Sequence, residues 1–153
     1  MKKVDYLCYM IVFLTLVTTL SGLLYSNGGS EFVVENIYGD SILLYGDGVY
    51  SYNSLLKAGG NKGTDLAMLF VVIAFSIFTY MGKNNHKARL LQIGTLSGLL
   101  YYSSCLVFGV TFNRLFPVYV ILFSFCLFSM IILLNDLANN IRLKNTPLGK
   151  TTR

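Results

Sequence analysis

The chain has 153 residues, of which 54% are hydrophobic and 12% are charged, and its formal net charge is +5. A soluble protein of this composition would have far too little polar surface, so the balance indicates a membrane protein. The positive charge does not indicate nucleic-acid binding, because the basic residues flank apolar runs instead of gathering on one exposed face beside aromatic residues.

Four apolar runs are long enough to cross a bilayer, near residues 6–25, 65–81, 90–110 and 116–134. A hydrocarbon layer about 30 Å thick needs about 20 such residues in a helix. The first run resembles a secretory signal, but no A-x-A-like cleavage site follows it, so we expect it to be retained. The sequence therefore predicts an all-α membrane protein with four transmembrane helices.

The distribution of Lys and Arg predicts the orientation, because these residues are enriched in cytoplasmic segments. They lie before the first run, between the second and third, and after the fourth, whereas the segment between the first two is mostly acidic. We therefore expect a multi-pass protein of the bacterial cytoplasmic membrane with both termini in the cytoplasm. The predicted parts are the N-terminus with helix one (1–25), an extracytoplasmic loop (26–64), helices two to four (65–134) and a polar cytoplasmic tail (135–153).

The loop between the first two helices has the pattern of short strands. Three runs rich in β-branched and aromatic residues, at 32–38, 41–45 and 49–53, are separated by Gly and Asp. Such punctuation is typical of hairpins, so we expect an extracytoplasmic β-hairpin or a meander of two or three strands. A segment this small cannot build its own core, and it should lean on the helix ends or on a partner.

The start of helix two contains an acidic residue with two interpretations. Residues 58–63 are glycine-rich and predict a flexible connector, after which Thr64 and Asp65 supply an N-cap. Asp65 would also suit the positive end of the helix dipole. The alternative is that Asp65 is a functional carboxylate.

Small residues in helices one and three predict close helix packing. Thr15, Thr18, Thr19 and Gly22 fall along one stripe of helix one, which favours packing over a path for solutes. Gly94 and Gly98 form a G-x-x-x-G step in helix three. We expect that step to pack against another helix of the same chain, with homodimer contact as the alternative.

The turn between helices three and four carries polar residues at the outer boundary. Arg114 is a basic residue on the side of the membrane where such residues are less expected. We predict that it pairs with Asp65, or that the two share a hydrogen-bond network with Asn113, covered by Tyr50 or another loop tyrosine. Together with Tyr119 these residues form the predicted polar cluster at the outer boundary. The alternative is that Arg114 extends to lipid headgroups.

Familiar catalytic and cofactor signals are missing from the sequence. No P-loop, G-x-S-x-G, H-E-x-x-H or G-x-G-x-x-G pattern occurs, and the predicted spans contain no central ionisable residue, which argues against a proton-coupled carrier. The cysteines fall within predicted helices as packing residues, and His86 is the only histidine. We therefore predict no catalytic, metal or cofactor site.

One run near the last two helices resembles a known group of proteins. It reads F-G-x-x-[FY]-N-x-L-F-x-x-Y-V, and a G-x-Y step and a G-x-D step precede it. The matching residues are Gly48, Tyr50, Gly63, Asp65, Phe108, Gly109, Phe112, Asn113, Leu115, Phe116, Tyr119 and Val120. The run is similar to that of a group of small bacterial four-helix integral membrane proteins. The resemblance implies the membrane topology, implies no activity, and draws attention to Asp65, Asn113, Arg114 and Tyr119.

These observations favour a protein that acts by interaction. The expected function is that of an accessory or sensing subunit, with the lipid bilayer and a membrane protein, or a second copy through helix three, as partners. The alternative is a small transporter or channel subunit, which would need a water-accessible polar stripe. A membrane enzyme with its site at the outer boundary is the third hypothesis.

Overall fold

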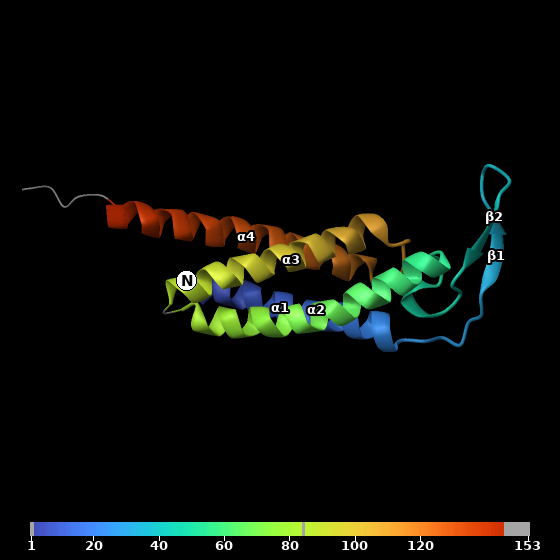
Figure 1. Cartoon of the computed structure of the whole chain (residues 1–153), viewed down its shortest axis with the longest axis horizontal. Helices are drawn as coiled ribbons and strands as arrows, with labels where there is room; N and C mark the ends of the chain where they lie inside the picture. The colour runs from blue at the N-terminus through green and yellow to red at the C-terminus, as the bar shows by residue number, and fades with distance from the viewer. Residues whose placement is uncertain (1, 84, 146–153) are drawn as a thin grey trace, which may run out of the picture.

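The computed structural model describes residues 2–83 and 85–145, and within them four helices account for most of the chain (Figure 1). Each of the four is long and apolar enough to cross a membrane. The helices are α1 (Lys2–Leu24), α2 (Leu55–Met81), α3 (His86–Gly109) and α4 (Phe116–Asn145). The predicted number and order of apolar helices are therefore confirmed.

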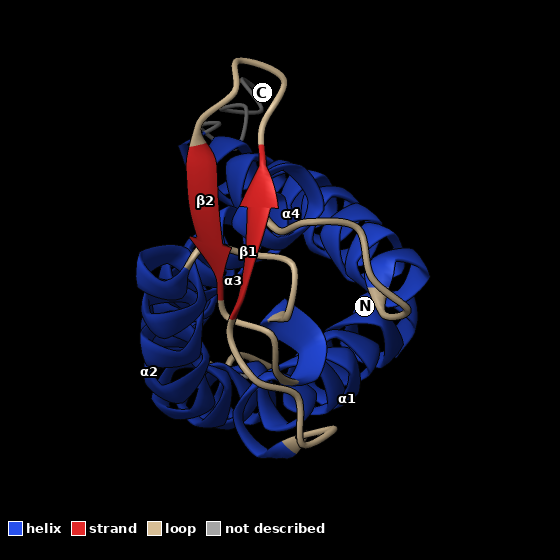
Figure 2. Ribbon diagram, turned by 90° about the vertical axis from the view of Figure 1, so that its right-hand side faces the viewer, coloured by secondary structure: helices blue, strands red, loops and turns tan. Residues whose placement is uncertain are grey.

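The helices form an antiparallel bundle in which each contacts its two neighbours. α1 packs against α2 and α4, and α3 packs against the same two helices. Viewed along the bundle, the four helices surround a single core (Figure 2). Buried side chains fill that core, among them Ile11, Phe75, Leu96, Leu99 and Leu122. Large apolar side chains are also exposed along the outer walls of every helix, as expected of helices that meet lipid.

The bundle has two different ends. At the hairpin end lie residues 25–54, which connect α1 to α2, and residues 110–115, which connect α3 to α4 (Figure 1). At the opposite end, called here the terminal end, α1 begins and the α2–α3 turn lies.

A two-stranded antiparallel hairpin projects from the hairpin end (Figures 1 and 2). Its strands are β1 (Phe32–Glu35) and β2 (Ser41–Leu44), with Phe32 opposite Leu44 and Glu35 opposite Ser41. The prediction of two strands is confirmed. The third predicted strand is not formed, because the chain turns through the short 3-10 helix η1 (Gly48–Tyr50) and returns to β2 only through the bridge between Leu44 and Ser54.

α2 begins ten residues earlier than predicted. Ser54 is its N-cap residue, so the glycine-rich residues 58–63 are helical and do not form a flexible connector. Although glycine disfavours helix, Ala58 is fully buried, and Lys62 Nζ donates a hydrogen bond of 2.8 Å to the Tyr45 hydroxyl. These tertiary contacts hold the first turns of α2 against the hairpin connection.

α4 also exceeds its predicted length. The predicted polar tail started at residue 135, but α4 continues to Asn145, and the remaining eight residues lie outside the described part of the chain. Near the start of this extension, Arg89 Nη2 on α3 forms a salt bridge of 3.7 Å with Asp136 Oδ2 on α4. This contact holds the helix pair together beyond the apolar run.

Candidate functional site at the hairpin end

A carboxylate lies inside the bundle at the hairpin end. Asp65 is ten residues into α2, about 15 Å along the helix axis from its start. Its side chain is 0% exposed. The Tyr50 hydroxyl donates a hydrogen bond of 2.7 Å to Oδ2, and the Tyr102 hydroxyl donates one of 2.5 Å to Oδ1. The predicted N-cap role of Asp65 is therefore wrong, because the helix has already begun and the carboxylate binds two phenols.

The first of these phenols comes from the loop and the second from a helix. Tyr50 ends η1 and is 1% exposed, so the loop inserts an aromatic side chain into the bundle. Burial raises the pKa of Tyr50, and the nearby Asp65 raises it further, so the phenol keeps its proton and acts as a donor. Tyr102 lies on α3 and is also buried.

α1 makes room for the carboxylate with a glycine. A Cβ atom added at Gly22 would lie 2.0 Å from Asp65 Oδ2 and 2.8 Å from the Tyr50 hydroxyl oxygen. Since no side chain can occupy that position without moving the carboxylate, α1 and α2 can approach closely only because residue 22 is glycine.

A second layer of hydrogen bonds fastens η1 to the α3–α4 turn. Asn53 is buried, and its Oδ1 accepts hydrogen bonds from the backbone N–H and the hydroxyl of Thr111, each 3.2 Å long. Asn113 Nδ2 donates to the Val49 carbonyl at 3.4 Å and to the Tyr119 hydroxyl at 3.5 Å. Val49 and Asn53, which lie before and after Tyr50 in the chain, are therefore both hydrogen-bonded to the α3–α4 turn, and these bonds hold Tyr50 in place.

Four of the five predicted boundary residues come together, and one does not. Asp65, Tyr50, Asn113 and Tyr119 lie in this network, and Tyr119 is buried with them. Arg114 is exposed, and the salt bridge found among the described residues is the one between Arg89 and Asp136. The predicted Asp65–Arg114 pair is wrong because Asp65 lies well inside the bundle, whereas Arg114 lies on the turn at its end.

The helix-three glycines do not make the close backbone contact that was expected inside the bundle, and their alternative role in homodimer contact stays a prediction. A Cβ added at Gly94 would meet no atom within 4 Å, and one added at Gly98 would meet only Val71 Cγ1, at an ordinary 3.8 Å. The glycine that does permit close contact is Gly22, on the same stripe as Thr15 and Thr18. Sequence reasoning associated that stripe with packing, but it did not connect Gly22 or Tyr102 to Asp65.

The cluster of Asp65, Tyr50, Tyr102 and Gly22 can hold a carboxylate but does not offer it to a solute. Both phenols donate to it, and the cation one turn away, Lys62, binds Tyr45 instead. Two pockets lie at the terminal end, and the residues that line them do not include Asp65. The arrangement suits a closed structural junction between the loop and three helices.

Neither a protein-family model, nor a curated protein, nor a solved structure matches this chain.

Proposed function

We propose that this chain is an accessory or sensing subunit of a membrane assembly, which binds a partner protein through its β-hairpin. The carrying observation is that the hairpin projects from the bundle with its apolar side chains exposed. Ile37 is 91% exposed, Tyr38 is 83% exposed and Val33 is 62% exposed. Apolar side chains gathered on a projecting element mark an interaction surface.

Neither face of the hairpin packs on the helices. Adjacent residues of a strand point to opposite faces, and Val33 and Val34 are both exposed. β1 pairs with β2 alone, so its outer edge has free backbone donors and acceptors. A lone two-stranded hairpin is at best marginally stable in water. A partner that covers an apolar face, or adds a strand to the open edge, would stabilise it.

The buried cluster gives the hairpin a fixed base. Tyr50 follows β2 by six residues and is fastened to Asp65 inside the bundle. The same turn is fastened to Thr111 through Asn53. A partner bound to the hairpin would therefore act on the ends of all four helices, which is what a sensing or accessory role requires.

The interior supports interaction over passage of a solute. The buried hydroxyls of Thr18 and Thr19 donate to the carbonyl of Thr15 on their own helix, at 2.9 and 2.8 Å. Tyr50, Asp65 and Tyr102 fill the core at the hairpin end. The hydroxyl stripe that a transporter would use is thus committed to helix packing.

We also propose an orientation of the helix bundle in the membrane. Among the described residues, the segments rich in Lys and Arg, near 2–3, 83–89 and 142–144, lie at the terminal end, and the acidic segment 31–47 lies at the hairpin end. The proposed location is the bacterial cytoplasmic membrane, with the termini in the cytoplasm and the hairpin outside.

Site-specific photo-crosslinking in cells tests the partner hypothesis. A photoreactive side chain at Tyr38 is expected to give an adduct of one defined mass with another protein. The matched control is the same group at Phe70, which is exposed on the wall of α2 and should react with lipid alone. Adducts with lipid alone from both positions would contradict the proposal and would indicate that the hairpin lies on the membrane surface.

A variant of the hairpin sharpens the test. Ile37→Asp should lower the yield of the Tyr38 adduct by roughly tenfold, because truncating an interface anchor costs more than about 1 kcal/mol. Leu56→Asp is the control, since Leu56 is 89% exposed but lies on α2 outside the hairpin. Equal losses in the two variants would mean that the hairpin has no special part in binding.

A further inference from the structure

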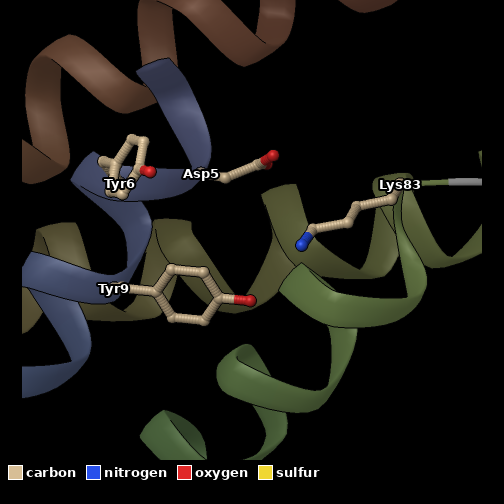
Figure 3. A pocket seen from close by; sticks show the side chains of 4 residues that line it. All are labelled: Asp5, Tyr6, Tyr9 and Lys83. Carbon is tan, nitrogen blue, oxygen red and sulfur yellow. The ribbon is translucent and has the colours of Figure 1, made fainter. Parts of the chain in front are cut away.

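The terminal end of the bundle contains a pocket of mixed chemistry (Figure 3). Its volume is about 190 Å³, and its lining residues are Asp5, Tyr6 and Tyr9 of α1 and Lys83, which follows α2. A cavity of about 150 Å³ can hold a molecule of the size of benzene, so this one can hold a small polar group. Figure 3 shows the Asp5 carboxylate and the Lys83 side chain on opposite sides of the opening.

The two charges of this pocket do not neutralise each other directly. Asp5 Oδ1 is buried and has no hydrogen-bond partner among the described residues. Arg89, a basic side chain at the same end, is engaged with Gln92 and Asp136. Lys83 Nζ instead lies over two aromatic rings, 5.8 Å from the centre of Tyr9 and 5.7 Å from that of Tyr80.

The Asp5 carboxylate lines the pocket and restricts the ligand that would fit. An ionised carboxylate accepts hydrogen bonds and donates none, so the ligand should bring an N–H or O–H donor to Asp5. A lone anion would be repelled by Asp5, and a lone cation would be repelled by Lys83. The complement is a small group that carries an ammonium at one end and an anion at the other.

We propose that this pocket binds a phosphorylated primary amine, the phosphoethanolamine headgroup of a phospholipid. Its ammonium would donate to the Asp5 carboxylate beside the rings of Tyr6 and Tyr9, and its phosphate would face Lys83. Tyrosine faces attract ammonium groups, and a lysine binds phosphate as a point charge. The lipid source rests on the membrane location proposed above, which places this end of the helices at headgroup level.

The headgroup chemistry makes a sharp distinction between two zwitterionic lipids. Phosphatidylcholine has the same net charge, but its quaternary ammonium has no N–H to donate to Asp5. The chain in nanodiscs with equal amounts of both lipids, analysed by native mass spectrometry, should retain phosphatidylethanolamine about tenfold more, the equivalent of one hydrogen bond to a charged group. Equal retention of the two lipids would overturn the proposal.

Variants of the pocket assign that preference to particular residues. Asp5→Leu should abolish it, because the acceptor for the N–H is removed. Lys83→Gln should weaken retention of both lipids equally, since both carry the phosphate, and Lys87→Gln should change neither, because Lys87 is an exposed lysine in the first turn of α3 outside the pocket. A Lys87→Gln variant that loses the preference to the same extent would overturn the site. If Asp5→Leu fails to fold, the exposed Lys83 provides the test: Lys83→Gln with an unchanged unfolding temperature should retain less of both lipids, and unchanged retention would overturn the site.

A soluble ligand distinguishes the two possible sources of this headgroup. Free phosphoethanolamine should not displace the lipid, because it lacks the acyl chains that would lie along α1 and α2. Displacement that depends on Asp5 would support the ligand chemistry and identify a free phosphorylated amine as the source. These measurements do not involve the hairpin, so their failure is distinguishable from failure of the partner hypothesis.

Discussion

A single carboxylate determines how the hairpin connection meets the bundle. Asp65 has no exposed area, and its two oxygens accept hydrogen bonds from Tyr50 and Tyr102. Each phenol brings a different element to α2, since Tyr50 belongs to η1 and Tyr102 to α3. A buried acceptor that loses its donor costs more free energy than the hydrogen bond itself contributes. The cluster should therefore behave as one unit under mutation.

We predict strong coupling between Tyr50 and Asp65. Tyr50→Phe removes one donor and should lower the free energy of unfolding by about 1 to 3 kcal/mol. In the Tyr50→Phe/Asp65→Asn double variant the losses should not add, because the two side chains share one hydrogen bond. The measurement is reversible unfolding in mild detergent, with Tyr52→Phe as the control at an exposed position of the same loop.

A double-mutant cycle between Asp65 and Arg114 should show no coupling. Asp65→Asn and Arg114→Gln should give additive changes, because Asp65 is buried with phenols and Arg114 is exposed. Coupling of the Arg114 pair as strong as that of the Tyr50 pair would contradict the arrangement of this cluster.

Two glycines give a matched prediction about packing. Gly22→Ala places a Cβ 2.0 Å from Asp65 Oδ2 and should destabilise the fold by about 1 to 3 kcal/mol or more through overpacking. Gly94→Ala meets no atom within 4 Å and should stabilise α3 by up to about 1 kcal/mol. Thermal unfolding of both variants in the same detergent would check this, and the reverse order of stability would show that α3, not α1, makes the close contact.

The sequence predicted the existence of the apolar helices and of the first two strands, but it did not predict where the helices begin and end. Long apolar runs and Gly-Asp turns are local signals, which is why they were readable. The start of α2 was missed because residues 58–63 look like a linker, while burial of Ala58 and the contact of Lys62 with Tyr45 are tertiary effects. The G-x-x-x-G step misled for the same reason, since spacing alone does not say which face of α3 meets a neighbour.

A turn next to the hairpin predicts a pH dependence. Asp47 Oδ1 accepts hydrogen bonds from the Ser26 hydroxyl at 3.0 Å and the Asn27 backbone N–H at 2.9 Å. These bonds hold the pKa of Asp47 below its ordinary value of 3.8, with the Ser26 bond as the larger cause. Because the folded pKa is depressed, the stabilisation is fully present above pH 3.8 and is lost as the pH falls through the folded pKa.

The amide of Asn27 is the natural probe of that contact. Its chemical shift, followed by NMR in detergent, should titrate with a midpoint below 3.8, and Asp47→Asn should abolish the titration. A midpoint at or above 3.8 would mean that the turn does not hold Asp47 in this way. The connection between α1 and β1 is then expected to loosen only in acid, leaving the hairpin anchored at neutral pH.

For the whole molecule, composition and charge carry most of what can be known from sequence. The four apolar helices and the basic terminal end follow from counting residue types along the chain. The packing of the interior does not follow from such counts. Helices that are apolar on every side have no hydrophobic periodicity that would show which face is inward. Thus Phe75 is fully buried and Phe70 is exposed on the same helix, although both are phenylalanines within one apolar run.

The whole-molecule prediction concerns orientation. In a variant with the exposed Cys105 replaced by Ser, the remaining cysteines, Cys8 and Cys126, are buried and should not react. A cysteine introduced at Ser51, next to η1, should then be labelled in intact cells by a membrane-impermeant maleimide. A cysteine introduced at His86, in the α2–α3 turn region, should be labelled only after the membrane is opened.

The opposite pattern would place the hairpin in the cytoplasm and contradict the proposed orientation. Labelling of both positions in intact cells would contradict a bundle that crosses the membrane, because Ser51 precedes the first residue of α2 and His86 follows its last, so the two lie beyond opposite ends of that helix. Those ends are separated by about 40 Å along 27 residues, more than the thickness of a hydrocarbon layer. A helix of that length with an apolar surface therefore cannot leave both ends on one side while it spans the bilayer.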